Sequence, residues 1–299
     1  CTRWLPMDEA VPDLAVFSYW GLPFVSQVPA SRRLLADRAR WPREGDPGCI
    51  AAIARELGWN APLPPPPLAP GLRPGTRRDT GLLAIHAGCK VGWPWKKWHG
   101  FGELANAFAK VVRVGTPGDH EVAGTYFAKP IAWPAHVADA TTPRPLADTA
   151  RLIAQCGALV ANDSGLMHLA AALGVPTLGI FGLTSPAREA MSWPALHTLS
   201  GGLSCEPACR SEPWGRRDCQ HHLECLKRIT PEKVAAHLHA IAPQLALRTT
   251  LSSGIPDDSR QPCPLATAPS PLPMEVKLGG GFGDLLIAGR VIEALRPLC

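Results

Sequence analysis

The sequence lacks the marks of several protein classes. No apolar run reaches about 18 uninterrupted residues, so no membrane-spanning helix is predicted. Charged residues are only 18% of the 299 residues, too few for a mostly disordered chain, whereas 46% are apolar. The opening residues CTRWLPMDEA contain neither the basic start and apolar core of a signal peptide nor an initiator Met. We therefore expect a globular cytoplasmic protein of about two domains, seen as a fragment or trimmed product.

Basic residues are not gathered into blocks. The net charge is +5, and Lys and Arg are spread along the chain. This weakly favours small anionic ligands or peripheral contact with a lipid surface, and it predicts no nucleic-acid partner. Ten cysteines in a chain of this length do not make a disulfide framework. Most are scattered, as buried thiols are in a reducing compartment.

Two proline-rich stretches divide the chain. Residues 61–81 indicate a stiff extended connector, and residues 248–273, rich in Ser, Pro and Thr, indicate a flexible linker. They separate the segments 1–60, 82–247 and 274–299.

Short apolar runs alternate with helical patterns in the central segment. Strands are expected at 81–88, 158–162 and 175–182, and helices at 99–112, 145–157, 165–174 and 184–190. Gly157 is expected to end the second helix, and Ser185 with Pro186 to begin the last. This spacing predicts parallel βαβ units in a doubly wound α/β sheet.

Polar residues gather where one predicted strand meets the next helix, in ANDSGLMHLAAALG. Ligands of open α/β sheets lie beyond the carboxyl ends of the strands. The N–H groups of Ser164, Gly165 and Leu166 would be unpaired first-turn donors at the positive end of the helix dipole. His168 lies one turn later and leans back toward the same point. The pattern predicts an anion site. The alternative is that Asp163 and Ser164 only cap a core helix and that His168 is a core histidine with its hydrogen bonds satisfied.

A second polar stretch, HAGCKVGWPWKKWHG, follows the first central strand. Its lysines, Lys96 among them, are suited to balancing phosphate charge. The alternative is a solvated loop on which tryptophans pack.

These motifs resemble glycosyltransferase family nine, the ADP-heptose:lipopolysaccharide heptosyltransferase group. The resemblance rests on NDSGLMHLAAALGVPTLGIFG with TSPAR, on KKWHGFGELANAF, and on a closing helix CLKRITPEKVAAHL. It implies a GT-B fold, in which two Rossmann-like domains face a cleft. It also implies an inverting transfer of a heptose-like sugar from an ADP-sugar to a saccharide, lipid-linked or protein hydroxyl, with no metal needed for catalysis.

The resemblance also implies roles for individual residues. The residues that would hold the donor's diphosphate and sugar are Lys96, Asp163, Ser164, Gly165, Leu166 and His168. An acidic residue after the next strand would contact the ribose, and both Asp119 and Glu121 fit this description.

The order of the segments departs from the family pattern. The family opens with a strand, a Gly-rich turn and a helix, whereas that unit here closes the chain at 274–299. By resemblance, Asp284 would be the general base on the acceptor hydroxyl, at the end of a turn with Gly280, Gly281 and Gly283; the alternative is a plain helix cap. The chain is therefore expected to be circularly permuted or cut from a tandem of transferase domains.

Segment 1–60 is expected to form a small acceptor-side domain together with 274–299, because a single βα unit cannot bury its own apolar face. A strand is predicted at 13–21, and helices at 31–41 and 48–59. The linker of about 26 residues spans roughly 30 Å on average, which is enough to return Asp284 to the cleft.

Four cysteines cluster with the spacing C-x3-C-x9-C-x5-C, namely Cys205, Cys209, Cys219 and Cys225. Four soft ligands in one stretch suit a tetrahedral Zn or Fe ion, and ordinary thiols or two disulfides are the alternatives. The cluster is similar in kind to the cysteine-bound iron of protein-modifying relatives in the family, and we expect it to be structural.

Besides a metal-binding interaction domain with no sugar chemistry, two other functions fit the sequence. One is a nucleotide-sugar-binding module without catalysis, because the acceptor-side domain is small and its base arrives out of order. The other is a different GT-B enzyme, such as a sugar-nucleotide epimerase or hydrolase.

Overall fold

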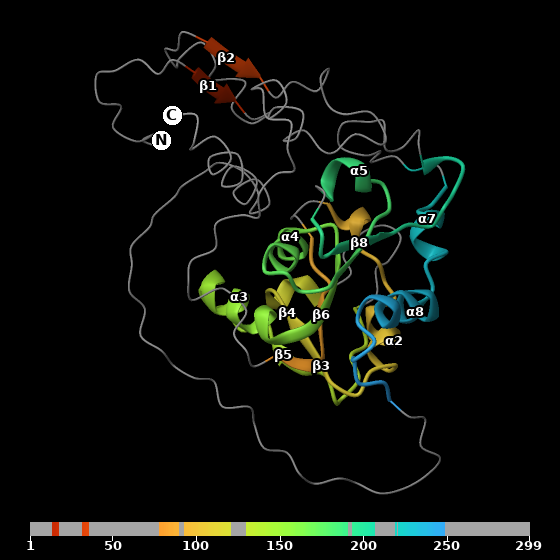
Figure 1. Cartoon of the computed structure of the whole chain (residues 1–299). Helices are drawn as coiled ribbons and strands as arrows, with labels where there is room; N and C mark the ends of the chain where they lie inside the picture. The colour runs from red at the N-terminus through yellow and green to blue at the C-terminus, as the bar shows by residue number, and fades with distance from the viewer. Residues whose placement is uncertain are drawn as a thin grey trace, which may run out of the picture.

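Six parallel strands form the sheet on which the described residues from 78 to 248 are built (Figure 1). The computed structural model describes residues 14–17, 32–35, 78–89, 93–120, 130–190, 193–206, 219 and 221–248. The strands of the sheet are β3 (Asp79–His86), β4 (Val111–Val114), β5 (Ala138–Ala140), β6 (Cys156–Asn162), β7 (Thr177–Ile180) and β8 (Leu196–Leu199). Their order is β5-β4-β3-β6-β7-β8, so the expected doubly wound α/β class is confirmed.

The chain changes direction across this sheet between β3 and β6. From β3 it proceeds outward to β4 and β5, then returns past β3 to continue through β6, β7 and β8. Strands β3 and β6 pair regularly from Leu83 and Ala158 to His86 and Ala161, after a register shift between Asp79 and Leu83. In open α/β sheets, such a switch point opens a crevice beyond the carboxyl ends of the strands. His86 and Asn162, the last residues of the two strands, therefore lie at its edge.

Helices cover both faces of the sheet (Figure 1). One core includes residues of α2 (Phe101–Ala105), α7 (Glu224–Lys227) and α8 (Pro231–Ile241), and the other includes residues of α3 (Leu146–Gln155) and α4 (Gly165–Ala172). Alternate strand residues enter alternate cores: Leu83 and Ile85 join the first, Ala84 the second. Because both faces are covered, β6 is buried along its whole length.

The helix expected over 99–112 ends at Ala105 in the structure, so the prediction is wrong for residues 106–112. Residues 107–109 make backbone hydrogen bonds or a β-bridge with residues 246–248, and Val111–Val114 forms β4. The apolar spacing fits a helix, but contacts with a segment distant in sequence take the backbone groups that a longer helix would use.

Two further expectations are wrong. Gly157 does not end a helix; it lies within β6, where a Cβ would meet the carbonyl oxygen of Thr80 at 2.0 Å, so its bare Cα lets β6 approach β3. The helix expected at 31–41 is replaced at Arg32–Leu35 by strand β2, which pairs in parallel with β1 (Leu14–Phe17). Periodicity alone does not separate a short apolar helix from a strand.

Other expected elements are confirmed with changed ends. Helix α4 is followed by Gly174, whose φ of 69° is the left-handed conformation of a helix stop. Helix α5 (Pro186–Glu189) begins after Ser185, although the Ser185 side chain makes no capping hydrogen bond. The closing helix is split in two, because Thr230 caps α8 through the N–H of Lys233 at 3.3 Å.

Several expectations concern residues outside the described ranges. These are the connector up to residue 77, the helix at 48–59, the linker from 249 to 273, the unit 274–299 with Asp284, Gly280, Gly281 and Gly283, and also Glu121 and Cys209.

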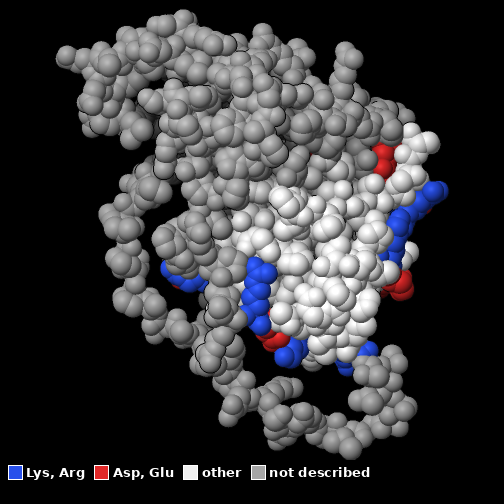
Figure 2. Space-filling model, viewed as in Figure 1, with Lys and Arg blue, Asp and Glu red and all other residues white. Residues whose placement is uncertain are grey.

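Several charged side chains on the surface of the described residues form ion pairs. Lys110 lies 3.0 Å from Asp79, and Arg113 lies 2.5 Å from Asp139. On the face drawn in Figure 2, the basic side chains of the described residues stand in separate groups. Within the described ranges, no helix has the length and apolar character needed to cross a membrane.

Candidate functional site

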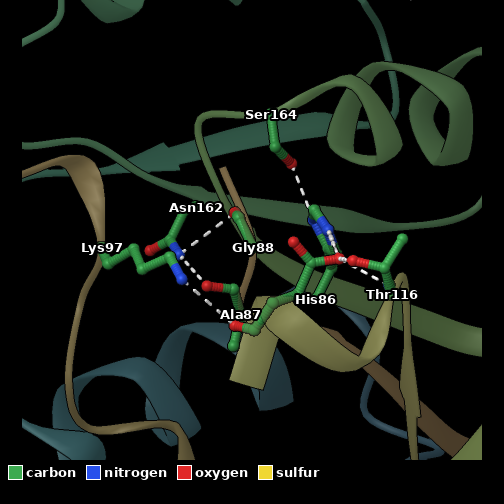
Figure 3. A network of polar contacts seen from close by, with 8 residues as sticks. His86, Ala87, Gly88, Lys97, Thr116, Asn162 and Ser164 are labelled. Carbon is green, nitrogen blue, oxygen red and sulfur yellow. Dashed lines mark hydrogen bonds and ion pairs between the residues drawn. The ribbon is translucent and has the colours of Figure 1, made fainter. Parts of the chain in front are cut away.

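Asn162 ties the end of β6 to the loop that follows β3. Its buried side-chain Nδ2 donates to the carbonyl oxygens of Ala87 at 2.8 Å and Gly88 at 3.3 Å (Figure 3). Its Oδ1 accepts the backbone N–H of Trp98 at 2.9 Å. One amide thus satisfies three backbone groups and fixes both ends of the loop between β3 and α2.

Trp98 anchors the far end of this loop in the core. Its ring is fully buried, packs edge-on against Phe101 at 5.0 Å, and donates Nε1 to the carbonyl oxygen of Ile229 at 2.8 Å. Trp98 is therefore a core residue, not a lid over a solvated loop. The short helix η4 (Pro94–Lys96) precedes it, so Lys96 is held at a fixed place.

Lys96, which is largely covered, forms an ion pair with the buried side chain of Asp163. Burial alone would raise the pKa of the Asp163 carboxyl, but Lys96 and a hydrogen bond from Thr184 hold it below its ordinary value. Burial opposes the charge of Lys96, yet Asp163 raises the Lys96 pKa above its ordinary value. Both groups are charged near neutral pH, and the two predicted site residues neutralise each other.

His168, in the first turn of α4, is buried beside this pair. Burial lowers its pKa, and the nearby Lys96 adds to this effect while Asp163 opposes it, so the imidazole is neutral. Its Nδ1 has no hydrogen-bond partner among the described residues. Buried polar atoms are rarely left unpaired, which makes Nδ1 a candidate contact for a ligand.

Ser164 occupies the N-cap position of α4 in an extended conformation, yet its side chain makes no capping hydrogen bond. Its Oγ instead lies 2.9 Å from Nδ1 of His86 (Figure 3). The first-turn N–H groups, including those of Gly165 and Leu166, have no partner within the helix, and they carry the positive end of its dipole. The start of α4 therefore combines donors and positive potential at the switch point.

His86 continues this contact to Asp119. Its Nε2 lies 3.5 Å from Oδ2 of Asp119, which also accepts the N–H and the hydroxyl of Thr116 at 2.6 and 3.0 Å (Figure 3). Burial would raise the pKa of the Asp119 carboxyl, but His86 and Thr116 hold it at about 2. Sequence analysis did not single out His86, although a polar residue that ends an apolar strand is the same signal that Asn162 gives.

The structure brings most predicted site residues to one place. Those that share the mouth of the switch point are Lys96, Asp163, Ser164, Gly165, Leu166 and His168. Asp119 lies at its edge, engaged by His86 and Thr116. Glu121 and Asp284 are outside the described residues.

Three of the four clustered cysteines are described. Burial raises the pKa of the Cys225 thiol to about 12, and the charges of Glu206, Cys219 and Cys205 add to the effect, which places these groups nearby. Sγ of Cys219 accepts the N–H of Leu223 at 3.4 Å. Among the described residues, no group of three or more metal-ligating side chains has a geometry that would hold an ion.

Comparison with known proteins gives the same family as the sequence motifs. Residues 84–213 match the family model described as glycosyltransferase family 9 (heptosyltransferase). The chain is 37% identical to lipopolysaccharide heptosyltransferase 2 of Salmonella typhimurium over 179 residues, which are 54% of this chain and 46% of that protein. It is 36% identical to lipopolysaccharide heptosyltransferase 1 of Pseudomonas aeruginosa over 110 residues, 33% of this chain and 31% of that protein. The chain thus spans about half the length, or less, of these curated relatives.

One solved structure shares the fold at low sequence identity. It is the dodecameric iron-containing heptosyltransferase TibC, from enterotoxigenic E. coli H10407, in complex with ADP-D-beta-D-heptose. The TM-score is 0.50 at 17% identity, over 75% of this chain and 66% of that one.

The Lys96–Asp163 pair generates a stability prediction. Lys96→Met leaves a buried carboxylate without its partner, so we expect the free energy of unfolding at pH 7.5 to fall by about 3–5 kcal/mol. The matched control is Lys110→Met, which breaks an exposed pair and should cost no more than about 1 kcal/mol. Urea denaturation measures both.

The free energy of unfolding lost in Lys96→Met should become smaller as the pH falls. Because the pKa of Asp163 is depressed in the folded state, the pair stabilises at neutral pH and loses this contribution as the pH falls through the folded pKa. The difference between wild type and Lys96→Met should therefore shrink on acidification. Equal losses for both variants at pH 7.5 would contradict the buried pair.

Proposed function

We propose that the chain binds an ADP-sugar and transfers a heptose-like sugar, with inversion, to a saccharide or protein hydroxyl. The match of residues 84–213 to the model of glycosyltransferase family 9 supports this proposal. The observation that carries the proposal is the mouth of the switch point. There the start of α4, the cation of Lys96 and the unpaired Nδ1 of His168 converge. This is the chemistry that a diphosphate leaving group requires.

Two observations on relatives support this ligand class. The curated relatives are named lipopolysaccharide heptosyltransferases. TibC, which shares the fold, has been solved in complex with ADP-D-beta-D-heptose.

The described residues would act mainly on the leaving group. As the bond between the anomeric carbon and the diphosphate breaks, negative charge grows on the diphosphate oxygens. Amides of Ser164, Gly165 and Leu166, with Lys96 and His168, would stabilise that charge. Fixed dipoles that already point at the developing charge need no reorganisation during the reaction.

The ribose contact is better assigned to Glu121 than to Asp119. Oδ2 of Asp119 already accepts two hydrogen bonds from Thr116 and faces His86. A ribose hydroxyl would have to compete with these partners. Glu121 follows two residues later in the sequence and is the remaining candidate.

Asp284 is proposed as the general base. It would take the proton of the acceptor hydroxyl while that oxygen attacks the anomeric carbon from the face opposite the nucleotide. The proposal requires the unit 274–299 to lie over the start of α4, either within this chain as a permuted domain or in a neighbouring domain of a tandem.

A sugar-transfer assay tests whether Asp284 is the general base. The full chain is incubated with ADP-heptose and heptose-free lipopolysaccharide core, and ADP release is measured alongside ADP binding by calorimetry. We expect Asp284→Ala to keep ADP affinity and to lose transfer by about 10²–10⁴-fold. The matched control is Asp257→Ala, in the predicted linker, which should retain both.

The same assay separates the alternatives. Full-rate transfer by Asp284→Ala would remove the base assignment. ADP binding without turnover on any acceptor would favour a non-catalytic module. Sugar release with water as the sole acceptor would favour a hydrolase, and failure to bind ADP would contradict the proposed function as a whole.

We also propose a structural Zn or Fe ion at the cysteine cluster. Cys205, Cys219 and Cys225 lie near one another, and an N–H donated to the sulfur of Cys219 is a contact that stabilises a ligating thiolate. Between the last two, His222 and Leu223 have positive φ values of 49° and 57°, which are uncommon outside glycine. TibC offers a precedent as an iron-containing heptosyltransferase.

Metal analysis tests this second proposal. Protein purified without chelator should contain about one equivalent of Zn or Fe by plasma mass spectrometry. Cys219→Ser should lower that content at least severalfold and also lower the melting temperature, because metal binding contributes to folding. Cys156→Ser changes a buried thiol in β6 and should leave the content unchanged. A metal-free wild type would contradict the site.

A further inference from the structure

The contact between His86 and Asp119 determines which nitrogen of His86 carries hydrogen. Burial would raise the pKa of the Asp119 carboxyl, but His86 and Thr116 hold it at about 2. The carboxyl is therefore ionised near neutral pH and can only accept hydrogen bonds. It lies 3.5 Å from Nε2 of His86, so the ring hydrogen is on Nε2. When the ring carries this one hydrogen, Nδ1 is an acceptor.

This tautomer directs the hydroxyl hydrogen of Ser164 inward. Oγ of Ser164 lies 2.9 Å from Nδ1 of His86, and the hydroxyl must donate to it. The lone pairs of Oγ are left to face the start of α4. An anionic oxygen there would meet lone pairs instead of a hydrogen, so the hydroxyl would not contribute to binding.

A proton on Nδ1 reverses this hydrogen bond. Doubly protonated His86 donates through Nε2 to Asp119 and through Nδ1 to Oγ of Ser164, which releases the hydroxyl hydrogen for a ligand oxygen. The same proton adds a positive charge close to the anion. We propose that His86 is a positioning residue, which takes up a proton when a diphosphate binds and so turns the hydroxyl of Ser164 toward it. The identity of the ligand rests on the proposed function.

Two glycines make room for the His86–Asp119 contact. A Cβ on Gly88 would lie 2.1 Å from Oδ1 of Asp119 and 2.6 Å from Nε2 of His86. A Cβ on Gly115 would lie 2.5 Å from Oδ2 of Asp119, and Gly115 has a φ of 119°. No larger residue fits at the ends of β3 and β4 while the imidazole and carboxylate stay together, so the contact depends on both strands.

The titratable and charged groups around this contact, among the described residues, are Asp119, Lys97, Cys89, Asp163 and Lys96. The carboxylate of Asp119 places a negative charge beside His86. Lys97, whose Nζ lies 3.5 Å from the Asp119 carbonyl oxygen, adds a positive charge, and the charges of Lys96 and Asp163 largely cancel each other. Burial raises the pKa of the Cys89 thiol to about 11, so it is uncharged. An incoming diphosphate is then the charge that draws the proton.

Calorimetry with ADP tests the proposal. Binding enthalpies in two buffers of different ionisation enthalpy give the protons taken up per ADP bound. At pH 8, where the terminal phosphate of ADP is largely ionised, we expect uptake of up to one proton by the wild type. Affinity should fall by up to tenfold per pH unit between pH 7 and 8.5, because a proton gained on binding is lost at high pH.

The matched variants are His86→Asn and Ser164→Ala. Asn offers an N–H donor in place of Nδ1 but cannot titrate, so His86→Asn should bind ADP with no proton uptake and with an affinity nearly independent of pH. Ser164→Ala removes the hydroxyl and should bind more weakly with reduced uptake. Thermal melts show whether each variant is folded. If His86→Asn does not fold, the proton uptake of Ser164→Ala alone tests the role proposed for His86.

The outcomes separate the two proposals. ADP binding by the wild type without proton uptake would overturn the role of His86 and leave the proposed function standing. Equal proton uptake by the wild type and Ser164→Ala would show that protonation is not coupled to binding through the hydroxyl of Ser164. This result would also overturn the role proposed for His86. Absence of ADP binding would contradict both proposals.

Discussion

The side chain of Asn162 holds together the two strand ends on which the site depends. A single amide accepts from Trp98 and donates to Ala87 and Gly88, and it is fully buried at the junction of β3 and β6. Losing it would leave three backbone groups without that partner, and a buried unsatisfied group costs about 1–3 kcal/mol. Because the loop between these contacts carries Lys96, the position of the cation follows from this network.

The polar groups of the site are mostly committed to one another before any ligand arrives. Lys96 faces Asp163, Ser164 faces His86, and His86 faces Asp119. An anion at a helix N-terminus gains roughly 0.3–2 kcal/mol, whereas micromolar affinity needs about 8 kcal/mol. The start of α4 alone therefore does not account for binding. A ligand must also recruit Lys96 and the hydroxyl of Ser164 from their present partners, and it gains the otherwise unpaired Nδ1 of His168.

The sequence predicted the sheet and the location of the site, because alternating apolar strands and amphipathic helices determine a parallel sheet and place polar residues such as Asp163 beyond a buried strand. It did not predict contacts between distant segments. The end of α2 is set by residues 246–248, and Gly157 is explained by the approach of Thr80. Lys96 and Asp163 were both identified, but their mutual neutralisation depends on the folded loop. His86 was missed because its partner Asp119 lies 33 positions further along the chain, beyond the next strand.

The central claim is that a diphosphate binds at the first turn of α4. The most direct measurement is the change in backbone amide chemical shifts when the full chain, labelled with ¹⁵N, is titrated with ADP and, in parallel, with adenosine. The account predicts that the amide resonances of Gly165 and Leu166 shift with ADP and remain in place with adenosine. Saturable binding of ADP that leaves these two resonances unmoved would contradict it.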